Sequence, residues 1–203
     1  LANRQVAAFI GKNMDGMPSK KPFVYRVHDV PDPDKIGVFS VFVKQFGHQM
    51  IMKSPKDIAN SMNRVLADVA GKREENMVEL LAIRTMSKAK YTTENIGHYG
   101  LGFHYYTHFT SPIRRWPDVM VHRLLQHYLD GEKVKNKEAI EAQCKHSSEM
   151  EKLSTDAERS SIKYMQVKYL VGKEGQEFNA LVSGVTEFGM FVELEDSLCE
   201  GLV

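Results

Sequence analysis

The sequence has few of the features that mark a secreted, membrane-spanning or strongly charged protein. Its 203 residues include only two cysteines, Cys144 and Cys199, too few for a disulfide framework, so we expect reduced thiols and a cytoplasmic protein. No apolar run approaches the ~18 residues that a membrane helix needs, and we expect no signal peptide. The 27 Lys and Arg nearly balance the 26 Asp and Glu, so the net charge of +1 does not point to a polyanion partner.

Helical periodicity accounts for much of what is present. Apolar residues recur at a spacing of three and four, and Ser-Pro pairs mark helix starts because serine caps free N–H groups and proline fits the first turn. We expect helices over residues 1–10, over Ile36 to Phe46, from Ser54-Pro55 to Val69 and over Val78 to Met86. A further helix is expected from Thr110-Ser111-Pro112 to Asp130, with Pro117 kinking it or dividing it in two, and a last one, with few interruptions, from Lys137 to about Leu170.

Strands are expected in fewer places. Phe23 to Val27 alternates as a short strand does, whereas residues 91–98, YTTENIGH, only interrupt the helical pattern. His98 to Phe109 is aromatic and glycine-containing, which indicates a strand or an extended segment. Residues 175–203 predict a pair of strands around a turn and the start of a third. The fold class is therefore α+β, and because the chain starts inside a helix and stops inside a strand, we expect a piece of a longer protein.

The densest chemistry lies in residues 107–123, THFTSPIRRWPDVMVHR. Thr110 and Ser111 stand at the expected helix start, where unpaired N–H groups and the helix dipole favour an anion. Arg114 and Arg115 follow, and an arginine fork matches phosphate oxygens with two parallel N–H bonds. On spacing alone, a capped helix with two solvated arginines is the better explanation of the pattern, because Ser-Pro caps are common.

Five motifs in order resemble the exoribonuclease II superfamily and cover the C-terminal half of its RNB catalytic domain. They are LAN at 1–3, PFVYRVHD at 22–29, GHYGL at 97–101, THFTSPIRR at 107–115 and AER at 157–159. The one departure noted is Trp116, where the family usually has tyrosine, which preserves an aromatic platform.

The resemblance implies a processive 3′-to-5′ exoribonuclease that releases nucleoside 5′-monophosphates with the help of magnesium held by aspartates. The family's aspartate cluster precedes this region, so the Mg²⁺ ligands are expected outside the chain, and the isolated chain is expected to be inactive. The nearest carboxylates, in HDVPDPD at 28–34, suit a rigid turn and helix cap better than a metal site. We therefore predict no metal ligand here.

The same resemblance assigns roles to single residues. The family residue matching Arg114 reaches the scissile phosphate, so Arg114 is the predicted catalytic residue. Thr110, Ser111 and Arg115 are predicted to hold the RNA backbone or the site. Glu158, from the AER motif, matches a position near the RNA end, with a plain surface charge on a long helix as the alternative.

The tail resembles the opening of the OB-fold module named after ribosomal protein S-one. It carries the FGxFV pattern, and such barrels bind single strands by stacking bases on exposed aromatics. Phe188 and Phe191 are the candidates, although either could be a core aromatic. We predict a catalytic part over residues 1–171 and a truncated, incomplete OB-fold barrel over residues 175–203.

Two functions remain open. The first is part of an exoribonuclease acting on single-stranded RNA 3′ ends, with a monomeric parent and no membrane partner; the second is a non-catalytic RNA-binding protein on the same scaffold. The histidines do not indicate a third function, that of a zinc protein. His104 and His108 are four residues apart, but the sequence has no HExxH motif and no cysteine pair, so packing or RNA-backbone contacts explain these histidines better than zinc.

Overall fold

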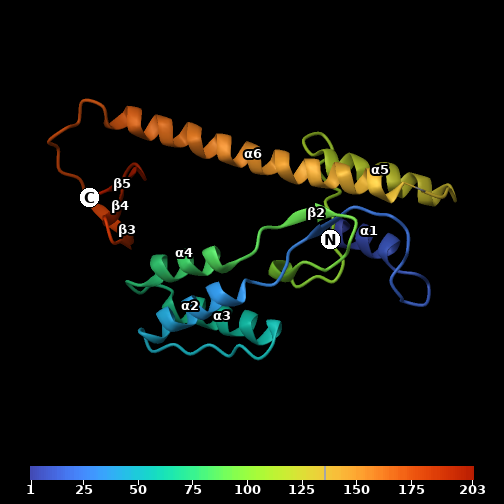
Figure 1. Ribbon diagram of the computed structural model, residues 1–203, viewed down its shortest axis with the longest axis horizontal. Coiled ribbons are helices and arrows are strands. Elements are labelled where there is room, and N and C mark those ends of the chain that lie inside the picture. The colour runs from blue at the N-terminus through green and yellow to red at the C-terminus, as the bar shows by residue number, and fades with distance from the viewer. Residues whose placement is uncertain (135) are drawn as a thin grey trace. The chain divides into compact units, whose positions relative to one another are not determined.

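The computed structural model describes residues 1–134 and 136–203. They form two compact units, Leu1–Glu149 and Met150–Val203. Figure 1 labels the elements: α1 (Ala2–Gly11), β1 (Tyr25–Val27), α2 (Pro33–Lys44), α3 (Pro55–Val69), α4 (Glu75–Thr85), β2 (Lys90–Thr92), the 3₁₀ helix η1 (Tyr99–Leu101), α5 (Trp116–Leu129), α6 (Lys137–Leu170), β3 (Ala180–Thr186), β4 (Gly189–Leu194) and β5 (Glu200–Leu202). The α+β prediction is confirmed, while the predicted division at residues 171–175 stays a prediction.

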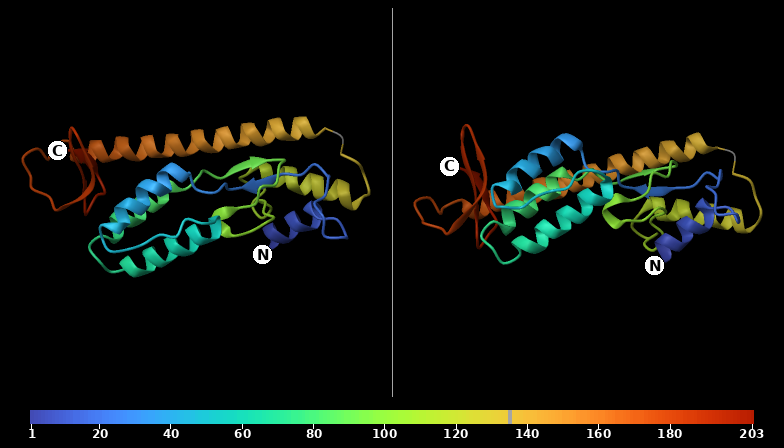
Figure 2. Two further views of the ribbon diagram at one scale, coloured as in Figure 1. Left: turned by 60° about the horizontal axis from the view of Figure 1, so that its bottom comes forward. Right: turned by 90° about the horizontal axis from the view of Figure 1, so that it is seen from below.

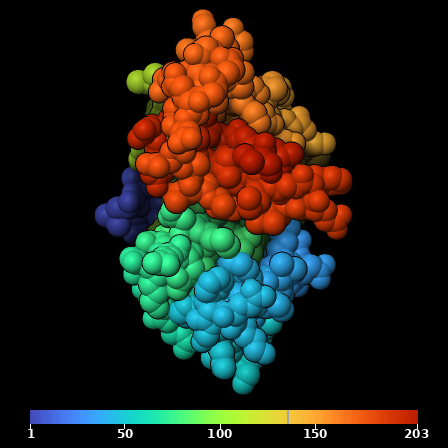
Figure 3. Space-filling model, turned by 90° about the vertical axis from the view of Figure 1, so that its left-hand side faces the viewer, coloured from blue at the N-terminus to red at the C-terminus, as the bar shows by residue number. Residues whose placement is uncertain are grey.

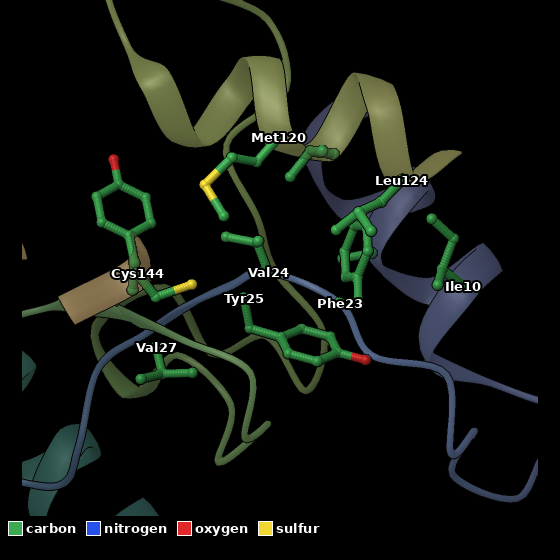
Figure 4. Close-up of a cluster of buried hydrophobic side chains, with 11 residues drawn as sticks. Ile10, Phe23, Val24, Tyr25, Val27, Met120, Leu124 and Cys144 are labelled. Atoms are coloured by element: carbon green, nitrogen blue, oxygen red, sulfur yellow. The ribbon is translucent and has the colours of Figure 1, made fainter. Parts of the chain in front are cut away.

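The first core of the unit Leu1–Glu149 forms around the short strand β1. Val24 and Val27 are fully buried, and α1, α5 and the start of α6 cover them with Ile10, Met120 and Cys144 (Figure 4). Burial and the Glu141 carboxylate raise the pKa of the Cys144 thiol to about 12. Cys144 is therefore a neutral core residue, which explains why its lysine and histidine neighbours in sequence do not activate it.

Strand β2 was not expected, because residues 91–98 show no strand pattern. It forms by pairing antiparallel with β1, with Arg26 opposite Tyr91. Each strand has only 3 residues, and so few positions do not show the alternation of apolar and polar residues by which a strand is predicted from sequence. Pairing with β1 therefore determines that β2 forms. The prediction of a strand near Phe23 to Val27 is confirmed.

A second core is built by α2, α3 and α4 alone. Phe39, Val43 and Val65 are buried among them, and Figure 2 shows the three helices side by side. The predicted start of α3 is confirmed, since the Ser54 hydroxyl accepts the Asp57 amide at 3.2 Å and Pro55 occupies the first turn. The outer surface of these helices appears in blue to green in Figure 3.

Helix α6 runs for 34 residues without interruption, as predicted. Its first half is hydrogen-bonded to β2 and to the residue that follows β2. The Ser148 hydroxyl accepts the Tyr91 amide at 2.9 Å, and the Glu141 carboxylate accepts the Thr93 amide at 2.6 Å. Within the described residues, no helix is long and apolar enough to cross a lipid bilayer.

The unit Met150–Val203 contains the three predicted C-terminal strands. They form one antiparallel sheet in the order β3-β4-β5, with a register shift between Val182 and Gly184. A bulge of this kind increases the local twist of a sheet. No closed barrel is present among the residues that the structure describes.

Candidate nucleic-acid interface

A turn over residues 110–115, here called the arginine turn, presents the two arginines. The prediction that Thr110-Ser111-Pro112 begins a helix is wrong, because α5 begins at Trp116. Two amides of the turn donate instead to the Ser111 carbonyl oxygen at 3.3 and 3.2 Å. Pro117 explains the late start, since proline fits the first turn of a helix but has no N–H for an interior bond.

Asp118 fixes the arginine turn from inside the first turn of α5. Its fully buried carboxylate accepts the Ser111 amide at 2.7 Å and Arg115 Nη2 at 2.9 Å, both on Oδ1. Oδ2 lies 2.9 Å from Arg115 Nε. A buried carboxylate needs such partners, so the ion pair determines where both the backbone and Arg115 lie. The sequence does not single out Asp118; the only signal is an arginine three residues before an acid in a first helical turn.

Arg114 is left available for a ligand. Its side chain is exposed and makes no hydrogen bond or ion pair with any other described residue. Thr110 is also exposed and Ser111 is half-buried. The structure therefore brings together on this turn the four residues that the motif singles out. Among their side chains, Asp118 holds that of Arg115. A guanidinium without a partner on a fixed turn can form two parallel bonds to phosphate oxygens.

Imidazole and tyrosine rings from segments that precede the arginine turn in sequence contact one another, and we call them the ring cluster. Tyr106 contacts His98 and His108 edge-on, with ring centroids 5.4 and 5.8 Å apart. His98 stacks on His28 at 5.1 Å, and the Tyr91 hydroxyl lies 2.8 Å from His108 Nδ1. These five rings come from four separate segments, so no linear motif could have revealed the cluster.

The two inner histidines of the ring cluster are neutral near pH 7. Burial lowers the pKa of His98 to about 4, and His28 and Arg26 add to the effect. Burial also lowers the pKa of His108 to about 4, helped by the positive charges of Arg115 and Arg26. Both rings therefore offer uncharged faces, while the positive charge of this region is concentrated on the arginines.

The expectation of a strand or extended segment over His98 to Phe109 is wrong for its first half, because residues 99–101 form η1 and a turn follows at Gly102. Residues 106–109, which belong to no helix, turn or bend, position the cluster. Successive side chains of an extended chain point to opposite sides. The buried Thr107 hydroxyl donates to the Val24 carbonyl oxygen at 2.7 Å, which anchors one side in the core. On the other side, Asn3 Nδ2 donates to the Tyr106 hydroxyl at 3.2 Å, and Asn3 Oδ1 accepts an amide of the same segment at 3.1 Å. The asparagine of the LAN motif is thus a positioning residue.

Trp116 extends the aromatic surface at the start of α5. The side chain is 47% exposed, and its Nε1 donates to Gln143 Oε1 at 3.3 Å. The Arg123 guanidinium lies 5.2 Å from the centre of the ring, a cation–π contact. These two contacts orient the indole while leaving much of it accessible.

The other three predicted site residues lie in the unit Met150–Val203. Glu158 is exposed on α6. Phe188, at the turn between β3 and β4, is 88% exposed, whereas Phe191 is half-buried in β4 opposite Gly184. The two phenylalanines therefore differ in exposure within this three-stranded sheet.

The acidic groups of the chain do not fit a metal pair. Within residues 1–134 and 136–203, no three His, Cys, Asp or Glu side chains lie where they could hold a metal ion. Asp32 Oδ1 accepts the Asp34 amide at 3.0 Å and begins α2, and Asp29 Oδ1 accepts the Val30 amide at 2.8 Å. The carboxylates of HDVPDPD serve the backbone, as the turn interpretation predicts.

Two comparisons at the level of sequence give the chain a family. The family model described as RNB domain matches residues 1–131. Ribonuclease R of Aquifex aeolicus is 40% identical over 186 residues, which make up 90% of this chain and 26% of that protein. The chain thus spans about a quarter of the length of this curated relative.

Solved structures have the same fold. Mycoplasma genitalium RNase R in complex with ribose methylated single-stranded RNA matches with a TM-score of 0.82 and 26% identity, over 99% of this chain and 32% of that chain. Yeast Ssd1, described as a pseudonuclease, matches with a TM-score of 0.78 and 23% identity, over 100% of this chain and 26% of that chain. The arginine turn and the ring cluster lie within the residues matched by the RNB model, and the chain belongs to the RNB domain family.

Proposed function

We propose that the chain is part of a 3′-to-5′ exoribonuclease that hydrolyses RNA processively to nucleoside 5′-monophosphates. The observation that carries this proposal is the guanidinium of Arg114, which has no partner among the described residues and extends from a turn that Asp118 holds. Similarity to a protein named ribonuclease R and to an RNase R structure containing single-stranded RNA supports the same function.

Arg114 acts on the scissile phosphate in this proposal. Attack on a phosphodiester builds negative charge on the phosphoryl oxygens, and a guanidinium carried on a held turn stabilises that charge more than it stabilises the ground state. Removing one preorganised donor of this kind costs ~2.7–4 kcal/mol of transition-state stabilisation. Thr110 and Ser111 hold the RNA backbone beside it. Arg115 contributes by keeping the turn in place through Asp118.

The partner is the 3′ end of single-stranded RNA. Neutral imidazole and tyrosine faces, such as His98 and Tyr106, suit stacking with bases of any sequence. Glu158 lies near the RNA end, and Phe188 and Phe191 belong to an S-one-type OB-fold whose first strands occupy residues 175–203. The exposure of Phe188 supports a stacking role.

RNB-family ribonucleases are in general metal-dependent. We infer magnesium, held by carboxylates outside these 203 residues, because the acidic groups of residues 1–134 and 136–203 do not fit a metal pair. Without those carboxylates, the isolated chain should not hydrolyse RNA. We also propose a catalytic part over residues 1–171, a monomeric parent and a cytoplasmic location, the last because Cys144 and Cys199 are both free.

A non-catalytic RNA-binding protein is the second candidate. Ssd1 is described as a pseudonuclease and shares this fold, so the fold by itself does not separate cleavage from binding. The separation depends on whether bound RNA is hydrolysed at all.

The test measures hydrolysis and binding on the same full-length protein. We expect release of mononucleotides from a 3′-tailed RNA in the presence of magnesium. Arg114→Ala should slow release by about 100-fold or more, while the Kd for RNA, measured by fluorescence anisotropy without magnesium, changes only a few-fold. Arg73→Ala, at an exposed arginine between α3 and α4, is the matched control and should change neither quantity.

Two results would contradict this proposal. No mononucleotide release by the unaltered protein, with RNA still bound, would favour the non-catalytic function. Equal losses of hydrolysis and binding in Arg114→Ala would mean that Arg114 contributes only ground-state binding.

A further inference from the structure

A hollow lined by lysines opens in the unit Leu1–Glu149, and we call it the lysine pocket. Its volume is about 700 Å³. Four ammonium-bearing side chains line it, together with neutral donors such as Tyr25 and Asn95, and none of its described lining residues is acidic. The lysines are Lys12, Lys20, Lys21 and Lys137.

The charge of the lysine pocket is not cancelled by ion pairs. Within the described residues, none of its lysines has a carboxylate oxygen within 4.0 Å. Lys12 instead lies 5.1 Å from the centre of the Tyr105 ring, and Lys21 lies 5.0 Å from that of Tyr128. Such cation–π contacts orient an ammonium group without neutralising it.

One carboxylate acts on the edge of this pocket. Lys137 contributes to lowering the pKa of Glu141, so these two charges interact at longer range. The oxygens of Glu141, however, are already engaged by the hydroxyls of Thr92 and Thr93 and by the Thr93 amide. Glu141 therefore offsets part of one of the four positive charges and leaves the other three unaffected.

The basic surface continues past the loop that follows α1, drawn in blue in Figure 1. A second hollow of about 570 Å³ shares Lys20 and Lys21 with the first and adds Lys133. The one acidic residue of its lining, Glu132, is engaged by His127. Lysines thus stand on both sides of the loop.

The lysine pocket and the ring cluster involve different, successive tyrosines of one segment. Tyr105 lines the pocket and packs against Gly11, whereas Tyr106 contacts His98 and His108 in the cluster. The pocket contains no residue of the arginine turn, so it is a separate site.

We propose that the lysine pocket binds the phosphate backbone of an RNA segment other than the 3′ end at Arg114. Several unpaired ammonium groups around one open hollow favour a ligand with several phosphates, because each neutralised phosphate releases counterions. The choice of RNA as that polyanion rests on the proposed function. Ammonium groups that contact phosphates carry no information on base sequence, so we expect binding without base selectivity.

The test compares three neutralised lysines at the pocket with three elsewhere. Lys12→Gln, Lys20→Gln and Lys21→Gln are combined in the full-length protein, and the control combines Lys35→Gln, Lys44→Gln and Lys72→Gln at exposed lysines of other elements. The Kd of a labelled single-stranded RNA is measured against salt concentration. Each lost phosphate contact should flatten the slope of log K against log salt by ~0.7, so the pocket variant should lose ~2.

The single variant Lys20→Gln shows whether a folding defect causes the effect of the triple variant. It should fold normally, since no ring contact or ion pair of Lys20 is present among the described residues. It should flatten the slope by ~0.7. An unchanged slope in both pocket variants, or equal flattening in pocket and control variants, overturns the inference.

The outcome is distinguishable from failure of the proposed function. The pocket variant should raise KM for RNA and leave kcat unchanged, the opposite of Arg114→Ala. If the unaltered protein releases no mononucleotides but the pocket variant still flattens the slope, the exoribonuclease proposal fails and the pocket remains. If release is normal but the slope does not respond, only the pocket fails.

Discussion

The guanidinium of Arg115 and the carboxylate of Asp118 form a two-point ion pair, with Nη2 2.9 Å from Oδ1 and Nε 2.9 Å from Oδ2. Asp118 is fully buried, while the Arg115 side chain is 21% exposed. The pair therefore connects the base of α5 to the edge of the proposed RNA site, and its loss should affect both.

Asp118→Asn should lower the free energy of unfolding by about 3 kcal/mol, because it leaves the Arg115 charge without its buried partner. Urea unfolding measures this directly. Asp130→Asn, which removes an exposed carboxylate bonded only to Gln126, is the control and should cost less than about 0.5 kcal/mol. Equal effects in the two variants would mean that the buried pair adds nothing special.

Acid should destabilise the protein through the ring cluster. The pKa of His98 and of His108 is about 4 in the folded state, against an ordinary value of 6.5. Between these values the unfolded chain binds more protons, so the stability that the neutral rings contribute is complete above pH 6.5 and is lost as pH falls towards 4.

Urea unfolding at pH 7 and pH 5 checks this expectation. His108→Gln should reduce the difference between the two pH values, because one of the two depressed groups is gone. A difference that does not change in this variant would place the pH dependence elsewhere.

Replacing Phe188 should affect RNA binding, whereas replacing Phe191 should affect the stability of the fold. Phe188→Ala should weaken single-stranded RNA binding by ~1–3 kcal/mol if its exposed ring stacks on a base, with little change in Tm. Phe191→Ala should lower Tm, because its half-buried ring packs over Gly184. The reverse pattern would contradict the assignment of Phe188 as the stacking residue.

Position 11 requires glycine because of the side chains around it, and not because of its backbone conformation. A Cβ there would lie 2.6 Å from the Tyr105 ring and 2.8 Å from the Tyr25 hydroxyl, so Gly11→Ala should cost about 1–3 kcal/mol. Gly37→Ala, inside α2 with nothing within 4 Å of the new Cβ, should instead stabilise by about 0.5–1 kcal/mol. Thermal unfolding of the two variants should therefore shift Tm in opposite directions.

What the sequence predicts well is local. The Ser54 cap, the stripe that becomes α3 and the uninterrupted α6 follow from spacing and cap chemistry within single segments. The arginine turn departs from this, because a Ser-Pro pair at 111–112 has the same local chemistry as that at 54–55. There, a buried carboxylate seven residues away takes the Ser111 amide and replaces the helical conformation.

The candidate site was predicted in part for the same reason. Arg114 and its neighbours belong to one motif, and the resemblance alone suggested their role. The ring cluster and Asp118 depend on burial and on segments far apart in sequence, such as His28 beside His98. Neither periodicity nor spacing contains that information.

The alternation at residues 105–108 also constrains how the sequence can vary in length. Inserting or deleting one residue between Tyr105 and His108 would exchange the two sides of the segment, turning Tyr106 inwards and a core-facing position towards the histidines. In an alignment of related chains, gaps should therefore not fall within residues 105–108, and this stretch should keep a constant length even where its residues differ.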